Sequence, residues 1–216
     1  SEETWWLPLE DINEEVSIRS TNPGRKPYLL NLWSGEITQA ADYTEENGYI
    51  KLPMKLKGND TVAVALADDC WNKGAKMPAF VKPVETVPLE NWNLTVYSHE
   101  PGDKALSGED LTDTRIVSLE IGEIGTAKPW TKLAGQENIS GVGIYRTEVY
   151  WDAEEKLRAE LNLGAVCDLY RLQVNGVEVP GANPVNPVQD ITKYLKSGVN
   201  VIQVEVASNF FHAEHS

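Results

Sequence analysis

Positive charge is scarce in this sequence of 216 residues, in which 33 acidic side chains face 19 basic ones and the formal charge is −14. A chain this acidic repels phosphate backbones, so nucleic-acid binding is not expected. The sequence also lacks an apolar run of about 18 residues and therefore predicts no membrane-spanning helix. Its opening residues are acidic and have no apolar segment of the kind found in signal peptides, which favours a mature or cut N-terminus at Ser1.

Residues that commonly carry catalysis are few or poorly spaced. The three histidines are His99, His212 and His215, and no spacing among them predicts a catalytic zinc site. Glycoside hydrolysis needs two carboxyl groups roughly 5 to 10 Å apart in one pocket. Neighbouring acids such as Glu109 and Asp110 would point to opposite faces of a strand and are expected to be solvated charge. We therefore predict that the chain is not catalytic by itself.

Only two cysteines are present, Cys70 and Cys167, and either a disulfide between them or two free buried thiols fits the sequence. Three Asn-X-Ser/Thr triplets begin at Asn59, Asn93 and Asn138. Such triplets are glycosylation acceptors in secreted proteins, so they favour a secreted, extracellular glycoprotein.

Helical periodicity is nearly absent, and short alternation of apolar and polar residues between Gly, Pro, Asn and Asp turns takes its place. This pattern predicts an all-β fold made of two β-sandwich domains. In the first domain, residues 1–80, strands are expected at 15–20, 27–31, 37–43, 49–56 and 61–66. Closely spaced prolines near residues 75–88 predict a linker.

The second domain, residues 81–216, has strands expected at 92–98, 115–120, 143–151, 158–163, 169–174, 177–179 and 199–207. Asn47-Gly48 and Asn175-Gly176 predict tight hairpin turns, because both residues tolerate positive φ. A short helix is expected at 191–195 with Asp190 as its N-cap. In the last strand, alternation places Asn200, Ile202, Val204 and Val206 toward the core, with the Asn200 amide bonded to buried backbone.

Five segments in the last third carry a resemblance to a known family. They are Gly143 to Thr147, Ala159 to Gly164, Leu172 to Gly176, Asp190 to Leu195 and Gly198 to Val206. Their order and spacing resemble the sugar-binding, galactose-binding-like jelly roll of family 2 glycoside hydrolases and of α-L-rhamnosidase-like enzymes. A second resemblance covers Pro27 to Glu36, Ile50 to Leu56 and Thr61 to Leu66, which are similar to a β-sandwich that follows the catalytic barrel in the rhamnosidase-like enzymes. These resemblances imply a module of a glycoside hydrolase whose partner is carbohydrate or an adjoining catalytic domain.

Sugar binding requires an exposed aromatic side chain beside groups that donate and accept hydrogen bonds. Trp130 is the first candidate because it lies in an expected loop at the end of a sandwich, and Trp71 is the second. Tyr145 and Arg146 belong to the strand that resembles the family, where Arg146 either reaches a ligand or pairs with Glu148. Three other tryptophans lie in strand patterns and are expected in the core: Trp33, Trp92 and Trp151.

A structural calcium ion is a further interpretation, because jelly rolls of the resembling kind often carry one. The oxygen ligands would come from Asp103, Glu109, Asp110 and Asp113, although their spacing is not that of an EF-hand.

Three functions remain open at this stage. The chain is a non-catalytic carbohydrate-binding module, a structural pair of domains that supports an absent catalytic barrel, or a complete small enzyme or stand-alone lectin. Fold resemblance does not separate the first two, since function depends on the site.

Overall fold

The computed structural model describes residues 10–68, 85–152, 158–166 and 169–208, and these are almost entirely β-strand and turn. The predicted all-β class is confirmed. The chain separates into two compact units, Ser1–Thr86 and Val87–Ser216. The domain boundary expected at residue 80 lies outside the described residues. Among the described residues, no helix is long and apolar enough to cross a membrane.

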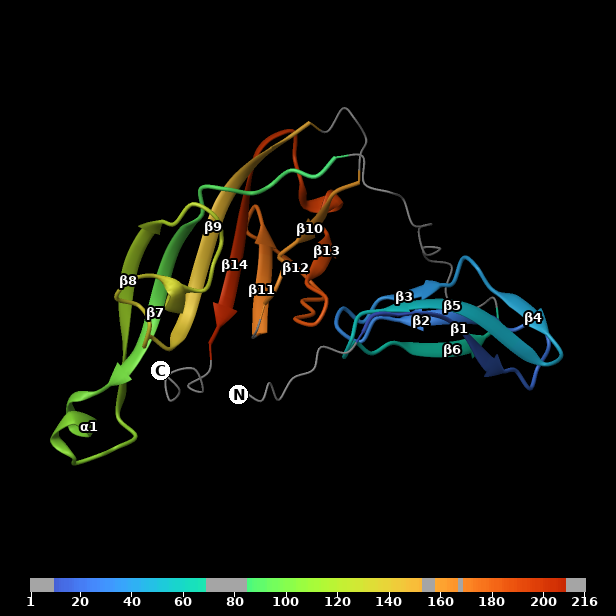
Figure 1. Ribbon diagram of the computed structural model, residues 1–216, viewed down its shortest axis with the longest axis horizontal. Coiled ribbons are helices and arrows are strands. Elements are labelled where there is room, and N and C mark those ends of the chain that lie inside the picture. Colours follow the sequence, from blue (N-terminus) through green and yellow to red (C-terminus); the bar gives the residue numbers. More distant parts are fainter. Residues whose placement is uncertain (1–9, 69–84, 153–157, 167–168, 209–216) are drawn as a thin grey trace. The chain divides into compact units, whose positions relative to one another are not determined.

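The first unit consists of two three-stranded antiparallel sheets (Figure 1). One sheet has the order β1 (Ile12–Arg19), β5 (Tyr49–Leu56), β4 (Thr44–Glu46), and the other has the order β3 (Ile37–Gln39), β2 (Lys26–Leu30), β6 (Ala63–Ala67). The predicted hairpin at Asn47-Gly48 is confirmed, since both residues have positive φ and Glu46 pairs with Tyr49. Alternation along β5 buries Ile50, Leu52 and Met54 against the other sheet.

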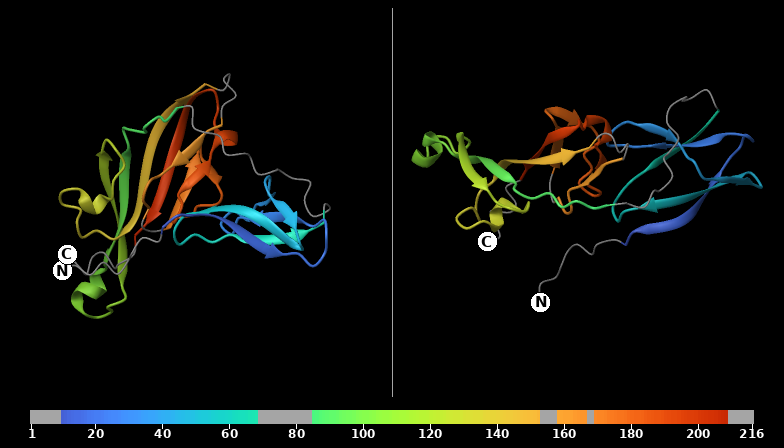
Figure 2. Two further views of the ribbon diagram at one scale, coloured as in Figure 1. Left: turned by 45° about the vertical axis from the view of Figure 1, so that its right-hand side comes forward. Right: turned by 90° about the horizontal axis from the view of Figure 1, so that it is seen from above.

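The second unit is built on a six-stranded antiparallel sheet (Figures 1 and 2). Its order is β12 (Val177–Val179), β11 (Leu169–Val174), β14 (Gly198–Ala207), β9 (Gly141–Trp151), β7 (Asn93–Pro101), β8 (Thr114–Glu123). A two-stranded sheet of β10 (Glu160–Asn162) and β13 (Val188–Asp190) belongs to the same unit. Short helices lie in the connections: α1 (Asp103–Ser107) and the 3₁₀ helices Trp130–Lys132 and Thr192–Tyr194.

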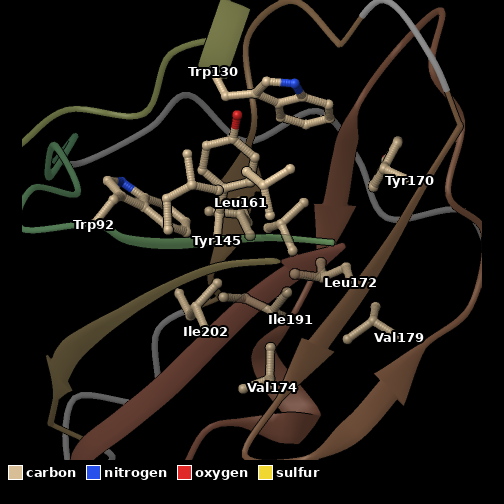
Figure 3. Packing of buried hydrophobic residues seen from close by; sticks show 13 residues of the cluster. Trp92, Trp130, Tyr145, Leu161, Tyr170, Leu172, Val174, Val179, Ile191 and Ile202 are labelled. Carbon is tan, nitrogen blue, oxygen red and sulfur yellow. The ribbon is translucent and has the colours of Figure 1, made fainter. Parts of the chain in front are cut away.

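One face of the six-stranded sheet is covered and forms the core of this unit. Figure 3 shows this cluster, in which strand residues meet side chains from the loops and from β10. The strands contribute buried aliphatic side chains because alternate positions share a face: Leu94, Val96, Leu172, Val174, Ile202 and Val204. Trp92, Trp130, Leu161 and Ile191 close the cluster from the other side. The opposite face of the sheet is called the outer face below.

The amides of Asn200 and Asn175 fix the beginning of β14. Asn200 is 0 % exposed, and its Nδ2 donates to the carbonyl oxygens of Lys196 and Gly198 at 2.8 and 2.9 Å. Its Oδ1 accepts from the Lys196 N–H at 2.7 Å and from Asn175 Nδ2 at 2.8 Å. The Asn175 amide also accepts from the Val201 N–H at 3.0 Å. The prediction that Asn200 points inward and bonds buried backbone is confirmed.

Other sequence-based expectations differ from the structure. Trp33 is 44 % exposed because it follows β2 in a turn, where its N–H donates to Asn31 Oδ1 at 2.9 Å. The helix expected at 191–195 is one 3₁₀ turn that Ile191 precedes, although Asp190 Oδ1 does accept from the Thr192 N–H at 2.9 Å. Strands β4 and β13 and helix α1 were not predicted from the sequence, and they have three, three and five residues.

Replacing Asn200 by alanine tests the importance of the amide network. Asn200→Ala removes every hydrogen bond of this buried side chain, including those to part-buried backbone groups of Lys196 and Gly198. We expect the free energy of unfolding to fall by about 3 kcal/mol, measured by urea unfolding of the full chain. The control Asn93→Ala changes an exposed amide on β7 and should cost less than about 0.5 kcal/mol. A loss below about 1 kcal/mol for Asn200→Ala would show that the network is dispensable.

Candidate functional site

The outer face of the six-stranded sheet presents polar side chains where the inner face presents the core. On β9, Gly143, Tyr145 and Thr147 are buried, so the intervening residues Arg146 and Glu148 face outward. Successive side chains of β9 therefore alternate between the core and the solvent-facing site.

Arg146 lies at the centre of a row of amides that crosses the sheet. It pairs with Asn93 of β7 on one side and with Gln203 of β14 on the other. Gln203 in turn pairs with Gln173 of β11. Directly opposed residues have their Cβ atoms about 4.5 to 5.5 Å apart, so these four side chains form a continuous polar row.

Two hollows, each of about 360 Å³, flank Arg146 and open to solvent. The first is lined by Asn91, Asn93, Arg146, Thr147 and Glu148. The second is lined by Arg146, Gln173, Asn175, Gly176, Val201 and Gln203. Arg146 is the residue that both hollows share, and this places its guanidinium at the middle of the candidate site.

The side chains of this site have few partners inside the chain. Within the described residues, the guanidinium of Arg146 makes neither an ion pair nor a hydrogen bond. It does not pair with Glu148, although the two lie two residues apart on the same face. The same face thus offers N–H donors, a carboxylate acceptor and amides that do both, which is the set needed by a ligand rich in hydroxyl groups.

Trp130, the first sugar-binding candidate, is a core residue. It is 4 % exposed, and its Nε1 donates to the Ile139 carbonyl oxygen at 2.8 Å. Its ring covers Gly143 so closely that a Cβ atom there would lie 2.5 Å from Trp130 Cζ3. The expectation of an exposed loop tryptophan is therefore wrong: the 3₁₀ turn that carries it folds over the sheet, and the indole has no free face for a sugar.

Tyr145 is also a core residue and does not reach the outer face. Its ring lies 6.4 Å from that of Trp130, and its hydroxyl donates to the Lys128 carbonyl oxygen at 2.9 Å (Figure 3). Burial raises the pKa of Tyr145 to about 12. Of the sugar-binding candidates, Arg146 alone is placed at the candidate site, since Trp71 lies outside the described residues, as do Cys70 and Cys167.

The acidic loop proposed for calcium does not gather its carboxylates. Among the described residues, no group of three or more His, Cys, Asp and Glu side chains could hold a metal ion. Asp110 accepts from both the hydroxyl and the N–H of Thr112, and the first of these bonds lowers its pKa most. Asp113 accepts from the Lys104 N–H at 3.0 Å, and the carboxylate of Asp103 lies 3.7 Å from the guanidinium of Arg115. The backbone N–H of Glu109 donates to the Lys104 carbonyl oxygen. These hydrogen bonds hold the loop.

Acidic residues elsewhere are stabilised as carboxylates. Burial alone would raise the pKa of Asp190, but hydrogen bonds from Thr192 and the nearby guanidinium of Arg158 lower it. The other described carboxyl groups with an altered pKa all have it lowered: Asp11, Glu46, Asp110 and Glu137. A general acid in glycoside hydrolysis needs a raised pKa, which none of these five groups has.

The three predicted glycosylation asparagines, Asn59, Asn93 and Asn138, are all exposed. Asn59 lies in a turn with φ of 67°, whereas Asn93 lies on β7 between β8 and β9 and lines the first hollow. Exposure is required for a glycan but does not establish one, so glycosylation stays a prediction.

The sequence matches no protein-family model and no curated protein. Among solved structures, a rhamnosidase from Novosphingobium sp. PP1Y is similar over 95 % of this chain, with a TM-score of 0.71 and 21 % identity. A β-glucuronidase from Ruminococcus gnavus is similar over 59 % of the chain, with a TM-score of 0.39 and 19 % identity. The similar regions amount to 18 % of the rhamnosidase and 22 % of the glucuronidase. The chain thus has the fold of a segment that is about a fifth of a rhamnosidase.

The buried phenol of Tyr145 predicts a loss of stability at alkaline pH. Because its pKa of about 12 in the folded chain exceeds the ordinary value of 10.0, the folded chain keeps the phenol proton to a higher pH than the unfolded chain does. Its contribution is complete below about pH 10 and is lost between about pH 10 and 12, by about 2 to 3 kcal/mol. Tyr145→Phe should make urea unfolding less sensitive to pH in this range, although Tyr170, whose pKa is also raised, will keep part of the dependence.

The same substitution should cost about 1 kcal/mol near pH 8, because it removes the hydrogen bond to the Lys128 carbonyl oxygen. Tyr150→Phe is the control, since Tyr150 lies exposed on the same strand and should leave the pH dependence unchanged. An identical alkaline loss for Tyr145→Phe and the unmodified chain would contradict the assignment.

Proposed function

We propose that this chain is a non-catalytic, carbohydrate-binding module of a secreted glycoside hydrolase that resembles the α-L-rhamnosidase-like enzymes. Its partners are then a glycan and the catalytic domain that adjoins it in such an enzyme. The fold likeness to part of a rhamnosidase supports the association with a glycoside hydrolase, since it extends over 95 % of the chain. The resemblance of the segments from Gly143 to Val206 to a sugar-binding jelly roll points in the same direction.

The observation that carries the binding function is the open polar row around Arg146. Its guanidinium has no partner among the described residues, yet it borders two hollows together with Asn93, Gln173 and Gln203. The strands that carry these donors and acceptors fix their spacing, so binding orders side chains but need not order the backbone.

A structural role beside a catalytic domain is the second candidate, and one observation favours it. At the far end of the outer face, Tyr97, Val142, Ala207 and Leu169 are in register across four strands. Tyr97 is 41 % and Leu169 is 68 % exposed, so this row presents apolar surface to solvent. Exposed apolar patches are typical of surfaces that meet another domain.

A glycan array followed by calorimetric titration of the full chain tests the binding function. We expect a dissociation constant in the range from about 1 µM to about 1 mM. Arg146→Ala should weaken binding at least about tenfold, because hydrogen bonds from a charged donor are lost. The same variant should change the free energy of unfolding by less than about 0.5 kcal/mol, since Arg146 has no partner within the described residues.

Arg115→Ala is the matched control, because Arg115 is an exposed arginine of β8 that pairs with Glu100 and lines neither hollow. It should bind as the unmodified chain does. Failure of the unmodified chain to bind any glycan would contradict the proposal and favour the structural role.

A further inference from the structure

The outer face of β9 has an aromatic side chain that extends the polar row. Tyr150 follows Arg146 and Glu148 at alternate positions, so the three side chains point the same way. Tyr150 is 71 % exposed and lies opposite Val199 of β14, which is also exposed. Pairing between β7 and β9 ends at Arg146, so within the described residues no paired strand lies beside Tyr150 on that side.

The spacing places Tyr150 beside the first hollow. Alternate residues of a strand are about 6.6 Å apart, so Tyr150 lies one such step from Glu148 and about 13 Å from Arg146. Asn93, the first residue of β7, lines the same hollow, as does Asn91 two residues before it. The outer face of β9 thus has a strip with the aromatic ring of Tyr150 at one end. The carboxylate of Glu148, the guanidinium of Arg146 and the amide of Asn93 follow in that order.

The mixture of groups selects the kind of sugar. A tyrosine ring offers a flat apolar face at a low cost in conformational entropy, and it suits the C–H face of a sugar ring. Sugar hydroxyls both donate and accept, so they match Arg146, Glu148 and the amides together. Glu148 lies next to Arg146 on this face, Glu205 lies 3.7 Å from Arg171, and Glu178 also faces outward, so the face has no excess of positive charge to attract a carboxylate. The strip therefore favours an uncharged glycan.

We propose that the strip from Tyr150 to Arg146 on the outer face of β9 binds a neutral oligosaccharide, with Tyr150 as the stacking platform. The ligand lies along β9, so that one sugar unit covers Tyr150 while hydroxyls of the following units bond Glu148, Arg146 and Asn93. This assignment rests on the proposed function as a carbohydrate-binding module and names its ligand class and its aromatic contact.

Calorimetric titration with tetrasaccharides of glucose, galactose and rhamnose, and with tetragalacturonate, tests the assignment. At least one neutral tetrasaccharide should bind more tightly than tetragalacturonate. Tyr150→Ala should weaken its binding at least about fivefold, as for the removal of an aromatic anchor, while Tyr150→Phe keeps the ring and should bind nearly as well. Thermal unfolding of each variant verifies that the exposed substitution leaves the fold intact.

Tyr97→Ala is the matched control. Tyr97 is a tyrosine on the same outer face, but its partner Val142 lies eight residues from Tyr150 on β9, about 26 Å away. Binding that Tyr97→Ala weakens and Tyr150→Ala does not would overturn the assignment and move the site to the apolar row. Tighter binding of tetragalacturonate would overturn the neutral class.

The outcomes also separate this inference from the proposed function. Glycan binding that Arg146→Ala removes and Tyr150→Ala leaves unchanged would overturn the stacking role while the module keeps its function. No binding of any glycan by the unmodified chain would overturn both.

Discussion

The hydrogen-bonded amide pair of Asn175 and Asn200 is the constraint on which the second unit depends. β14 is an inner strand of the six-stranded sheet and pairs with β9 over its full length from Gly198 to Ala207. A strand in that position must begin at a defined residue, because a shift by one position would turn its core face to solvent. The two amides fix that beginning by bonding Lys196, Gly198 and Val201 in one connected network. Since the bonds connect the turn at Asn175 with the first residues of β14, the network specifies the register as well as adding stability.

The register between β14 and β9 determines which side chains of β9 face the core and which face outward. Val204 pairs with Tyr145 and faces the core, so Gln203 and Arg146, which pair one step away, face outward. Gly143 completes the inner face, because its missing side chain leaves space for the ring of Trp130. The packing of the core and the position of the candidate site are thus set by the same alternation on one strand.

The sequence predicted the parts of this arrangement that alternation controls. The class of fold, the turn at Asn175-Gly176 and the inward face of β14 are as expected, since strand periodicity places side chains without reference to distant contacts. Trp130 was misplaced because its burial depends on how a loop folds back over Gly143, which no local pattern reports. Tyr150 was overlooked as a candidate, although counting alternate positions from Arg146 was enough to place it on the outer face. The acidic loop failed as a calcium site for a similar reason, since hydrogen bonds to Thr112 and Lys104 decide where its carboxylates point.

Glycosylation of Asn93 would depend on the cell that makes the protein and would affect the candidate site. Asn93 begins an Asn-Leu-Thr triplet and lines the hollow beside Arg146. A glycan attached to its amide would emerge within the hollow and occupy the space that an external ligand needs. Protein produced in a host that modifies this triplet would therefore carry its own blocking group, whereas protein from a host without that modification would have the hollow free. On the proposed binding role, the choice of expression host would decide whether the hollow beside Arg146 is covered or free.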